Sequence, residues 1–346
     1  MHARLGYSSY AAYRLERRLA ESSRWGYGFM DTYARIYSLF TGRKGGKEFT
    51  RYCRTSPAST FPTISTTTIT ITTTTNPTTT APMEEQVSHL VDKLQHKLAN
   101  LPANKRYLVA VSGIPGSGKT TLASRVANSL NSRCRRSDTH EKSAAAAADT
   151  TPTTSALDVA TFLPMDGYHL TRAQLSALPD PAHAHARRGA AFTFDAPAFL
   201  ALVKKLREPI GADTKTIYAP SFDHAVKDPV ERDIAIPGSS RVVVMEGNYL
   251  SLGKDEWKEA AGLMDELWFV EVEEEVARKR LVRRHVASGI ARDEEEAGRR
   301  ADENDLVNGR EIVEGRLEVH EVIRSEEDER WGPERQGVEK EMGSTR

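Results

Sequence analysis

The sequence has little cysteine: only Cys53 and Cys134 occur among its 346 residues. Both lie in segments that do not read as folded, which excludes a disulfide framework and a Cys-based zinc site and is typical of a reducing intracellular compartment. The sequence also lacks an apolar run that approaches the roughly 20 residues needed to cross a bilayer. We therefore expect a soluble protein with no membrane span.

The chain has no excess of charge of either sign, because Lys and Arg total 48 and Asp and Glu also total 48. Without net charge there is no chain-wide field to attract nucleic acid or an anionic membrane, so we expect neither as a partner. Any anion-binding site must be local. Hydrophobic residues make up 39% of the chain and are unevenly spread along it, which favours one core over two.

Residues 1–83 lack the pattern of a folded domain. The first 54 residues hold eleven Lys or Arg against four Asp or Glu, and a Thr-rich tract follows at residues 63–80. We expect a disordered extension here. Its basic start leaves two interpretations open, a mitochondrial transit peptide or a dispensable extension, and with them a mitochondrial or a cytoplasmic location.

Residues 84–324 read as one folded domain, followed by a charged tail at 325–346. Short apolar runs predict strands, and 3.6-residue periodicity predicts helices between them. The strands are expected at 107–112, 159–165, 216–219, 241–245 and 266–272, and the helices at 84–99, 119–130, 197–206, 274–287 and 293–308. This alternation predicts an α/β fold, a doubly wound parallel sheet covered on both faces. The Ser-, Thr- and Ala-rich stretch 131–155 reads as a disordered insertion.

A glycine-rich segment between the first strand and the next helix matches the phosphate-binding pattern G-x-x-x-x-G-K-[ST]. Its glycines let backbone N–H groups surround phosphate oxygens, Lys119 can reach the β and γ phosphates, and the Thr120 hydroxyl can bind Mg²⁺. A glycine-rich turn can also join strand and helix without a ligand, but the strand–loop–helix context favours ATP and Mg²⁺ as cofactors. The expected nucleotide-binding residues are Gly113, Ile114, Pro115, Gly116, Ser117, Gly118, Lys119, Thr120 and Thr121.

Two acidic residues follow predicted strands. Asp166 comes directly after the second strand, where a carboxylate can face the γ-phosphate and accept the proton of an attacking hydroxyl. Glu246 ends the apolar run Val242–Met245, as does the acid that holds Mg²⁺ or its waters in other phosphate-loop enzymes. Asp166 could equally begin a turn or cap a helix, and Glu246 could simply be exposed at a strand end.

A basic run lies on the predicted helix 274–287, where Arg280, Arg283 and Arg284 share part of one face. Such a cluster can close over a transferring phosphate as a helical lid. It can also be a solvated face paired with neighbouring acids. The residues alone leave open which arginine contacts phosphate.

Six motifs in order, GIPGSGKTT, MDGYHL, TFDAPAF, PSFDHAVKDP, VVVMEGNYL and RLVRRHVASGI, resemble the phosphoribulokinase/uridine kinase family of P-loop kinases, in its nucleoside-kinase-like branch. The resemblance covers residues 84–308. It implies that Asp166 is the catalytic base and a Mg²⁺ neighbour, and that Thr120 and Glu246 complete the metal site. It further implies that Asp195 binds sugar hydroxyls and that His224 contacts a base or sugar.

The resemblance also implies a lid with arginines at Arg280, Arg283 and Arg292, of which Arg280 is expected to bind the nucleotide. Two segments depart from the uridine kinase pattern, namely Gly167-Tyr168-His169 after the base and Arg187-Arg188-Gly189. Both lie where the acceptor should bind. Tyr168, His169 and Arg188 are therefore candidate acceptor-binding residues, alongside a purely structural interpretation of each.

The sequence therefore predicts a phosphotransferase that moves the γ-phosphoryl group of ATP to an alcohol of a nucleoside, sugar or vitamin-like metabolite, with Lys119, Asp166 and Arg283 as catalytic residues. Two alternatives remain, a non-catalytic ATP-binding regulatory protein of the same fold and a pantothenate-type kinase. The acceptor and the oligomeric state are not encoded in a recognisable pattern.

Overall fold

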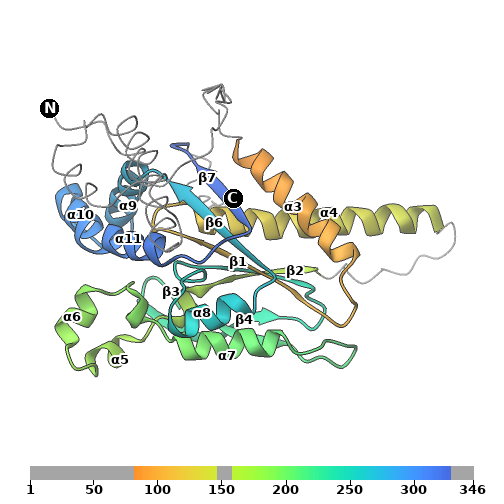
Figure 1. The fold of residues 1–346 in the computed structure, drawn as a ribbon, viewed down its shortest axis with the longest axis horizontal. Coiled ribbons are helices and arrows are strands. Elements are labelled where there is room, and N and C mark those ends of the chain that lie inside the picture. Colours follow the sequence, from red (N-terminus) through yellow and green to blue (C-terminus); the bar gives the residue numbers. More distant parts are fainter. Residues whose placement is uncertain (1–81, 146–157, 329–346) are drawn as a thin grey trace, which may run out of the picture. The chain divides into compact units, whose positions relative to one another are not determined.

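The computed structural model describes residues 82–145 and 158–328 (Figure 1). Three predicted segments lie outside the described residues. They are residues 1–81 of the N-terminal extension, with the possible transit peptide, the second part of the predicted insertion, and residues 329–346 of the tail. The elements below are given within the described part of the chain.

A five-stranded sheet in the order β2-β5-β1-β6-β7 forms the centre of the described domain, and every neighbouring pair in it is parallel. In chain order its strands are β1 (Tyr107–Gly113), β2 (Ala160–Pro164), β5 (Val242–Glu246), β6 (Glu266–Val272) and β7 (Glu321–Ser325). The predicted parallel α/β fold is confirmed. Four of the strands fall where the apolar runs predict them, and β7 was not predicted.

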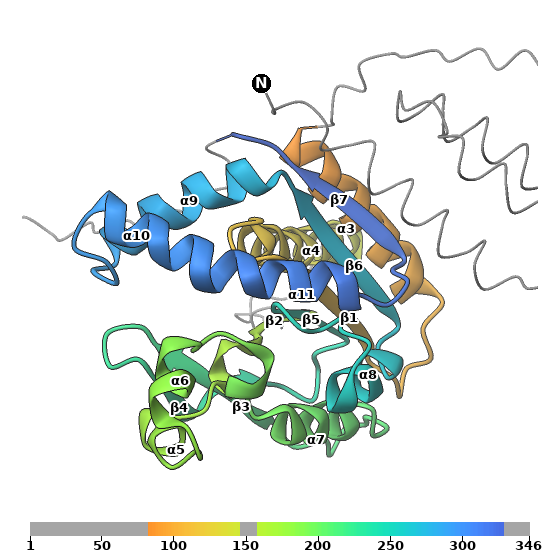
Figure 2. The ribbon, with the colours of Figure 1, turned by 60° about the vertical axis from the view of Figure 1, so that its left-hand side comes forward.

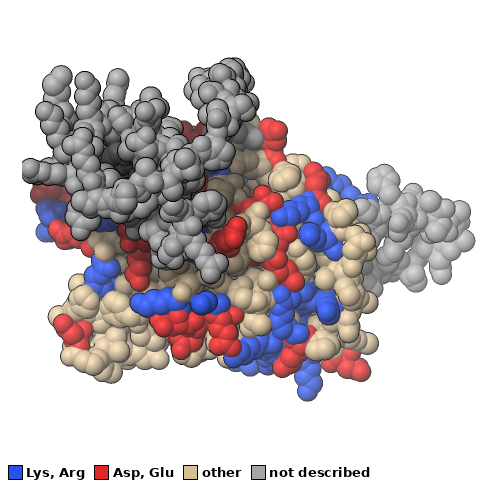
Figure 3. Space-filling view, viewed as in Figure 1, with Lys and Arg blue, Asp and Glu red and all other residues tan. Residues whose placement is uncertain are grey.

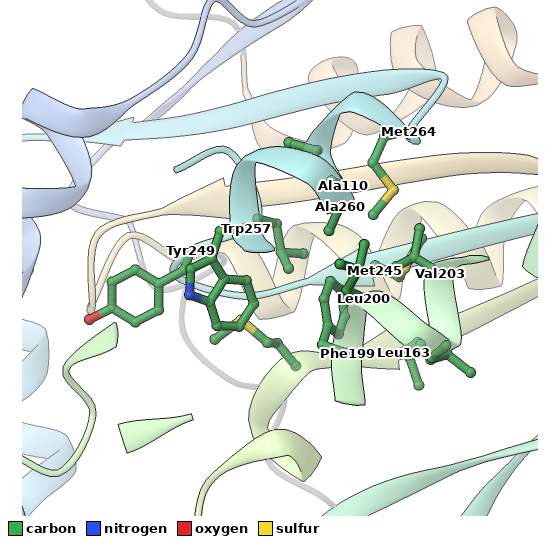
Figure 4. Close-up of a cluster of buried hydrophobic side chains, with 14 of the residues drawn as sticks. Ala110, Leu163, Phe199, Leu200, Val203, Met245, Tyr249, Trp257, Ala260 and Met264 are labelled. Atoms are coloured by element: carbon green, nitrogen blue, oxygen red, sulfur yellow. The ribbon is translucent and has the colours of Figure 1, made fainter. Parts of the chain in front are cut away.

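Helices cover both faces of the sheet (Figures 1 and 2). Because side chains alternate along a strand, Val109 and Val111 pack on one face with α3 (Met83–Ala99) and α4 (Lys119–Ala145), while Leu108 and Ala110 pack on the other. The second face is covered by α7 (Ala196–Leu206), α8 (Asp255–Gly262) and α11 (Leu306–Gly315). Figure 4 shows its centre, where Phe199 and Val203 lie beside Met245.

A smaller layer lies beyond the carboxyl ends of β2 and β5. It contains an antiparallel hairpin, preceded by short helices. These elements are η2 (Met165–Tyr168), α5 (Arg172–Ser176), α6 (Pro181–Ala186), η3 (Ala191–Thr193), β3 (Ile217–Asp223) and β4 (Asp228–Ile236). Sequence periodicity predicts only part of β3 and wrongly places it among the strands of the parallel sheet. It does not predict β4, which begins at Asp228, a residue that could have been read as part of a turn.

The lid region consists of α9 (Glu274–Ala287), α10 (Glu294–Arg300) and a π-helical turn η4 (Ala301–Asp305) that leads into α11. The sequence predicts one regular helix at 293–308 in place of the last three. A π-turn inserts one extra residue and rotates the side chains that follow it, and such turns are frequent at functional sites.

The boundaries of the folded domain also need correction. The helix α4 continues to Ala145, so the prediction of disorder from Asn131 onward is wrong for residues 131–145. The start of this segment also contacts the sheet, because the Asn131 amide donates to the Ala160 carbonyl oxygen at 2.9 Å and accepts from its N–H at 2.8 Å. At the other boundaries, Met83 is buried in the core and Ser325 belongs to β7.

None of the helices in the described ranges combines the length and hydropathy that a membrane crossing requires. On the face drawn in Figure 3, Lys and Arg side chains lie interspersed with Asp and Glu. That part of the described surface therefore presents charge of both signs.

Candidate active site

The phosphate-binding loop joins β1 to α4, as the motif predicts. Gly116 and Gly118 have φ values of +80° and +85°, a region that favours glycine. A Cβ on Gly116 would lie 2.7 Å from the Ala277 carbonyl oxygen of α9, so the loop and the lid helix approach each other at backbone distance. Gly113 and Ser117 are equally close, since a Cβ on Gly113 would lie 2.8 Å from the Ser117 hydroxyl oxygen.

Lys119 and Glu246 face each other at the floor of the site. The Lys119 Nζ lies 3.9 Å from Glu246 Oε1, and both side chains are buried. Burial lowers the pKa of Lys119, against the charge of Glu246, which raises it. Burial raises the pKa of Glu246 to about 7, although the charge of Lys119 and a hydrogen bond with Thr120 act in the opposite direction.

Asp166 stands at the next strand end along the sheet. In the parallel register Pro164 of β2 is opposite Glu246 of β5, which is opposite Val111 of β1, so the carboxylates and the phosphate loop share one edge. Asp166 raises the pKa of both Lys119 and Glu246, which places its charge within reach of theirs. Its side chain is 48% exposed and can therefore meet an incoming hydroxyl.

The residues present fit ATP and Mg²⁺. The only hydrogen bond of the buried Lys119 ammonium within the described structure is a long one of 3.4 Å to the Ile114 carbonyl oxygen, so donors remain for phosphate oxygens. Thr120, Asp166 and Glu246 offer hard oxygen ligands, which Mg²⁺ prefers. Within the described ranges no group of three or more His, Cys, Asp and Glu side chains could hold a metal ion alone, and Mg²⁺ in nucleotide sites normally relies on substrate phosphates for part of its shell.

The lid arginines differ in position. The charge of Arg284 lowers the pKa of both Lys119 and Glu246, so Arg284 lies within electrostatic range of the phosphate floor. Arg283 instead affects the pKa of Arg280. Arg280 donates to the Gly116 carbonyl oxygen at 3.2 Å and to the Ser325 hydroxyl at 2.7 Å. Arg292 is exposed and pairs with Glu296 at 2.9 Å.

The sequence predicts Arg283 as the catalytic arginine, and Arg284 is a second candidate because its charge acts on Lys119 and Glu246. Both side chains are exposed on α9. Arg280 is already bonded to loop carbonyls, so in this conformation it supports the loop.

Aromatic rings lie beside Asp166. His169 stacks on Phe194 with ring centroids 3.9 Å apart, and its Nε2 lies 4.0 Å from Asp166 Oδ1. Phe222 of β3 lies 5.1 Å from the His169 ring and 5.2 Å from that of His224. Burial lowers the pKa of His169 to about 4, although Asp166 raises it, so the ring is neutral at pH 7.

The hairpin is held tightly over the Asp166 segment. A Cβ on Gly167 would lie 2.1 Å from the Pro220 carbonyl oxygen of β3. Arg188 donates to the carbonyl oxygens of Leu170 at 2.9 Å and Lys227 at 2.6 Å, and it pairs with Asp228 at 3.4 Å. These bonds support the structural interpretation of Arg188, whose partners lie up to 40 residues away in the sequence.

The remaining acceptor candidates have mixed roles. Asp195 caps α7, accepting from the Ala198 N–H at 2.9 Å through one carboxylate oxygen. Tyr168 is buried edge-to-face against Phe199, and burial raises the pKa of its hydroxyl. His224 is exposed in the hairpin turn.

Comparison with known proteins finds relatives among fungal kinase-like proteins. The chain is 56% identical over 159 residues to the ATP-dependent kinase-like protein notR′ of Aspergillus versicolor, an alignment that covers 46% of the chain and 92% of that protein. It is 36% identical over 225 residues to a proposed uridine kinase of Schizosaccharomyces pombe, covering 65% of the chain and 83% of that protein.

Among solved structures, a proposed fructose transport system kinase of Silicibacter sp. is similar with a TM-score of 0.55 and 28% identity, over 68% of the chain and 98% of that protein. No protein-family model matches the chain. The alignments to both fungal proteins nevertheless span most of their length, and the phosphate loop, the two strand-end carboxylates and the lid are in the expected order. The chain therefore belongs to the phosphoribulokinase/uridine kinase family of P-loop kinases.

Proposed function

We propose that the protein is an ATP-dependent kinase that transfers the γ-phosphoryl group to a hydroxyl of a nucleoside, sugar or related metabolite. The observation that carries this proposal is the buried Lys119–Glu246 pair with Asp166 on the adjoining strand end. A protein that only bound nucleotide would need the phosphate loop but not an exposed carboxylate within reach of the γ-phosphate position.

In the proposed reaction the acceptor oxygen attacks the γ-phosphorus, the bond between that phosphorus and the β,γ-bridging oxygen breaks, and ADP leaves. Asp166 takes the proton of the hydroxyl. Lys119 and Arg284 stabilise the negative charge on the transferring group, a contribution that dominates when the transition state is loose. Mg²⁺, when bound beside Thr120, Glu246 and Asp166, would neutralise phosphate charge.

The name of the fungal relative, a proposed uridine kinase, supports a nucleoside as one acceptor class. The side chains around Asp166 support the same class in part. The partly exposed ring of Phe222 could stack on a planar group, and the second Asp195 carboxylate oxygen is available for hydroxyl groups.

A phosphorylation screen of a metabolite library tests the proposal. The protein is incubated with Mg-ATP and pooled nucleosides, sugars and pantothenate, and products are read by mass spectrometry. We expect one acceptor to gain a phosphoryl group with equimolar release of ADP. Tight Mg-ATP binding without turnover of any acceptor would instead favour a regulatory nucleotide-binding protein.

A further inference from the structure

Arg187 is a cation that the structure bonds only to neutral groups. It follows α6, and its Nη1 donates to the Glu303 carbonyl oxygen at 3.1 Å while Nη2 donates to Asn308 Oδ1 at 2.6 Å. Within the described ranges no carboxylate lies in ion-pair distance of it. The neighbouring Arg188 differs, because Asp228 neutralises it. Hydrogen bonds to a carbonyl and an amide oxygen that only supported the fold would not require a positive charge.

The anchor of Arg187 adjoins the phosphate loop. Asn308 is buried in α11, and the next residue, Gly309, packs on the loop so closely that a Cβ there would lie 3.3 Å from the Ile114 Cβ. Arg187 is therefore held by a side chain one residue away from direct contact with the nucleotide-binding segment. Figure 2 shows α6 below the α10–α11 arm on this side of the sheet.

The backbone beyond Arg187 is fixed from two directions. The Asn304 amide, from the π-turn η4, donates to the Arg188 carbonyl oxygen at 3.0 Å. The Tyr249 hydroxyl donates to the Gly189 carbonyl oxygen at 2.7 Å, and Figure 4 shows this hydroxyl directed out of the hydrophobic cluster. Gly189 has a φ of +105°, which favours glycine. A cation on such a rigid segment is preorganised for a ligand.

Hydrogen bonds connect the Arg187 segment with the strand ends that carry the site. Arg188 donates to the carbonyl oxygen of Leu170, four residues after Asp166. Tyr249, three residues after Glu246, donates to the carbonyl oxygen of Gly189. The Arg187-Arg188-Gly189 segment therefore lies beside the edge of the sheet that holds both carboxylates and the phosphate loop.

We propose that Arg187 is a further anion-binding residue of the site and contacts the γ-phosphoryl group of bound ATP. This inference rests on the proposed function. It assigns a role to the Arg187-Arg188-Gly189 segment, which has no evident counterpart in the uridine kinase pattern. Asn308 acts as a positioning residue, because it fixes the guanidinium.

Paired nucleotide titrations test this role. The full chain is titrated by calorimetry with ADP and with the non-hydrolysable ATP analogue AMP-PNP, both with Mg²⁺. Arg187→Gln should weaken AMP-PNP binding by about ten- to a hundredfold, the value of a charge-assisted hydrogen bond, and leave ADP binding within about twofold. Arg187→Lys should retain part of the AMP-PNP affinity because it keeps the charge. Arg310→Gln is the matched control, since Arg310 is exposed on α11 and lies 3.7 Å from Glu274.

Equal weakening of both nucleotides by Arg187→Gln would mean that the residue only supports the fold, and it would overturn the proposal. Unchanged AMP-PNP binding would overturn it as well. The thermal midpoint of each variant, measured beside the titrations, identifies a folding defect. If Arg187→Gln has such a defect, the AMP-PNP and ADP affinities of Arg187→Lys decide between a phosphate contact and a supporting role. A wild-type protein that binds neither nucleotide would overturn the proposed function itself and this inference with it.

Discussion

The Lys119 ammonium nitrogen and the nearer Glu246 carboxylate oxygen are 3.9 Å apart, so the two buried groups attract each other without a direct hydrogen bond. This separation leaves unused donors on Lys119 and unused lone pairs on Glu246 at the point where the phosphate loop ends. Neither charge would be retained in such a buried position for stability alone, because an imperfect buried pair contributes little to it.

Lys119→Ala should nearly abolish turnover and weaken ATP binding, because it removes the cation at the β and γ phosphates. Loss of charge-assisted hydrogen bonds should cost about 1.5–3 kcal/mol in binding. Calorimetric titration with Mg-ATP and an assay of ADP release measure the two effects. Lys204→Ala provides the control, since Lys204 is exposed on α7 and pairs with Glu259. Full ATP affinity in the Lys119 variant would exclude its predicted contact.

Asp166→Asn should behave differently, because the phosphate cradle remains while the proton acceptor is lost. The value of kcat should fall by roughly 10²- to 10⁴-fold, as for other general bases, with little change in nucleotide affinity. Steady-state kinetics with the acceptor found in the screen provide the measurement. A near-normal kcat would return Asp166 to a turn-forming role.

Glu266 predicts a pH dependence of stability. Burial acts to raise its pKa, but hydrogen bonds from Lys93, Trp268 and Tyr107 lower the pKa below its ordinary value. A lowered carboxyl pKa contributes stability above the pKa of the unfolded chain, about 4.5, and loses that contribution as the pH falls through the folded-state value. The Glu266 interactions therefore stabilise the fold at pH 7 and weaken below about pH 4.5.

Glu266→Gln should lower the free energy of unfolding by about 1.5–3 kcal/mol at pH 7, the value of hydrogen bonds to a charged group. The difference from wild type should shrink in acid. Urea denaturation at pH 7 and at progressively lower pH measures it, with the exposed Glu259→Gln as the control, for which we expect about 0–1 kcal/mol. A difference that stays constant with pH would contradict the ionised state assigned to Glu266.

The extent of α4 changes what can be deleted from the chain. Replacing residues 146–157 by a short linker should leave nucleotide binding and the thermal midpoint near those of wild type. Removing 131–155 should destabilise the fold, because Asn131 holds the Ala160 backbone through two hydrogen bonds. Asn131→Ala separates this contact from the loss of helix and should cost about 1–3 kcal/mol by leaving buried backbone groups unpaired. Equal midpoints for both deletions would show that the Asn131 contact is dispensable.

Much of the central sheet could be predicted because buried parallel strands are nearly continuous apolar runs. Val242–Glu246 is fully buried, and its sequence signals a strand without ambiguity. The exposed β4 carries Asp, Pro, Glu and Arg, so its pairing with β3 is visible only in three dimensions. The short β7 was missed for the same reason, since alternate residues of Glu321–Ser325 face solvent.

The candidate site shows the same division. Residues within one motif, such as Lys119 and Thr120, could be assigned because local backbone geometry fixes their positions. Contacts between distant segments could not, and they decide the roles of Arg188, which Asp228 neutralises, and of Arg284, whose charge acts on Lys119. The π-turn η4 was equally invisible, because its residues fit a regular helical pattern.

Asp195→Asn separates the two roles that remain for this residue. As the N-cap of α7 it accepts from the Ala198 N–H through one oxygen, and Asn caps a helix about as well as Asp, so the thermal midpoint should hardly change. The second oxygen is expected to bind a hydroxyl of the acceptor. Losing the charge there should cost about 1.5–3 kcal/mol, or about ten- to over a hundredfold in kcat/KM for the true acceptor, with ATP affinity unchanged.

An acceptor analogue that lacks one of the paired hydroxyls completes the test of Asp195. It should be a poor substrate for the wild-type protein but lose little further activity in Asp195→Asn, because both changes remove the same interaction and such effects are not additive. Additive losses would mean that Asp195 only caps α7. The preference for a nucleoside or sugar would then depend on the partly exposed ring of Phe222 alone.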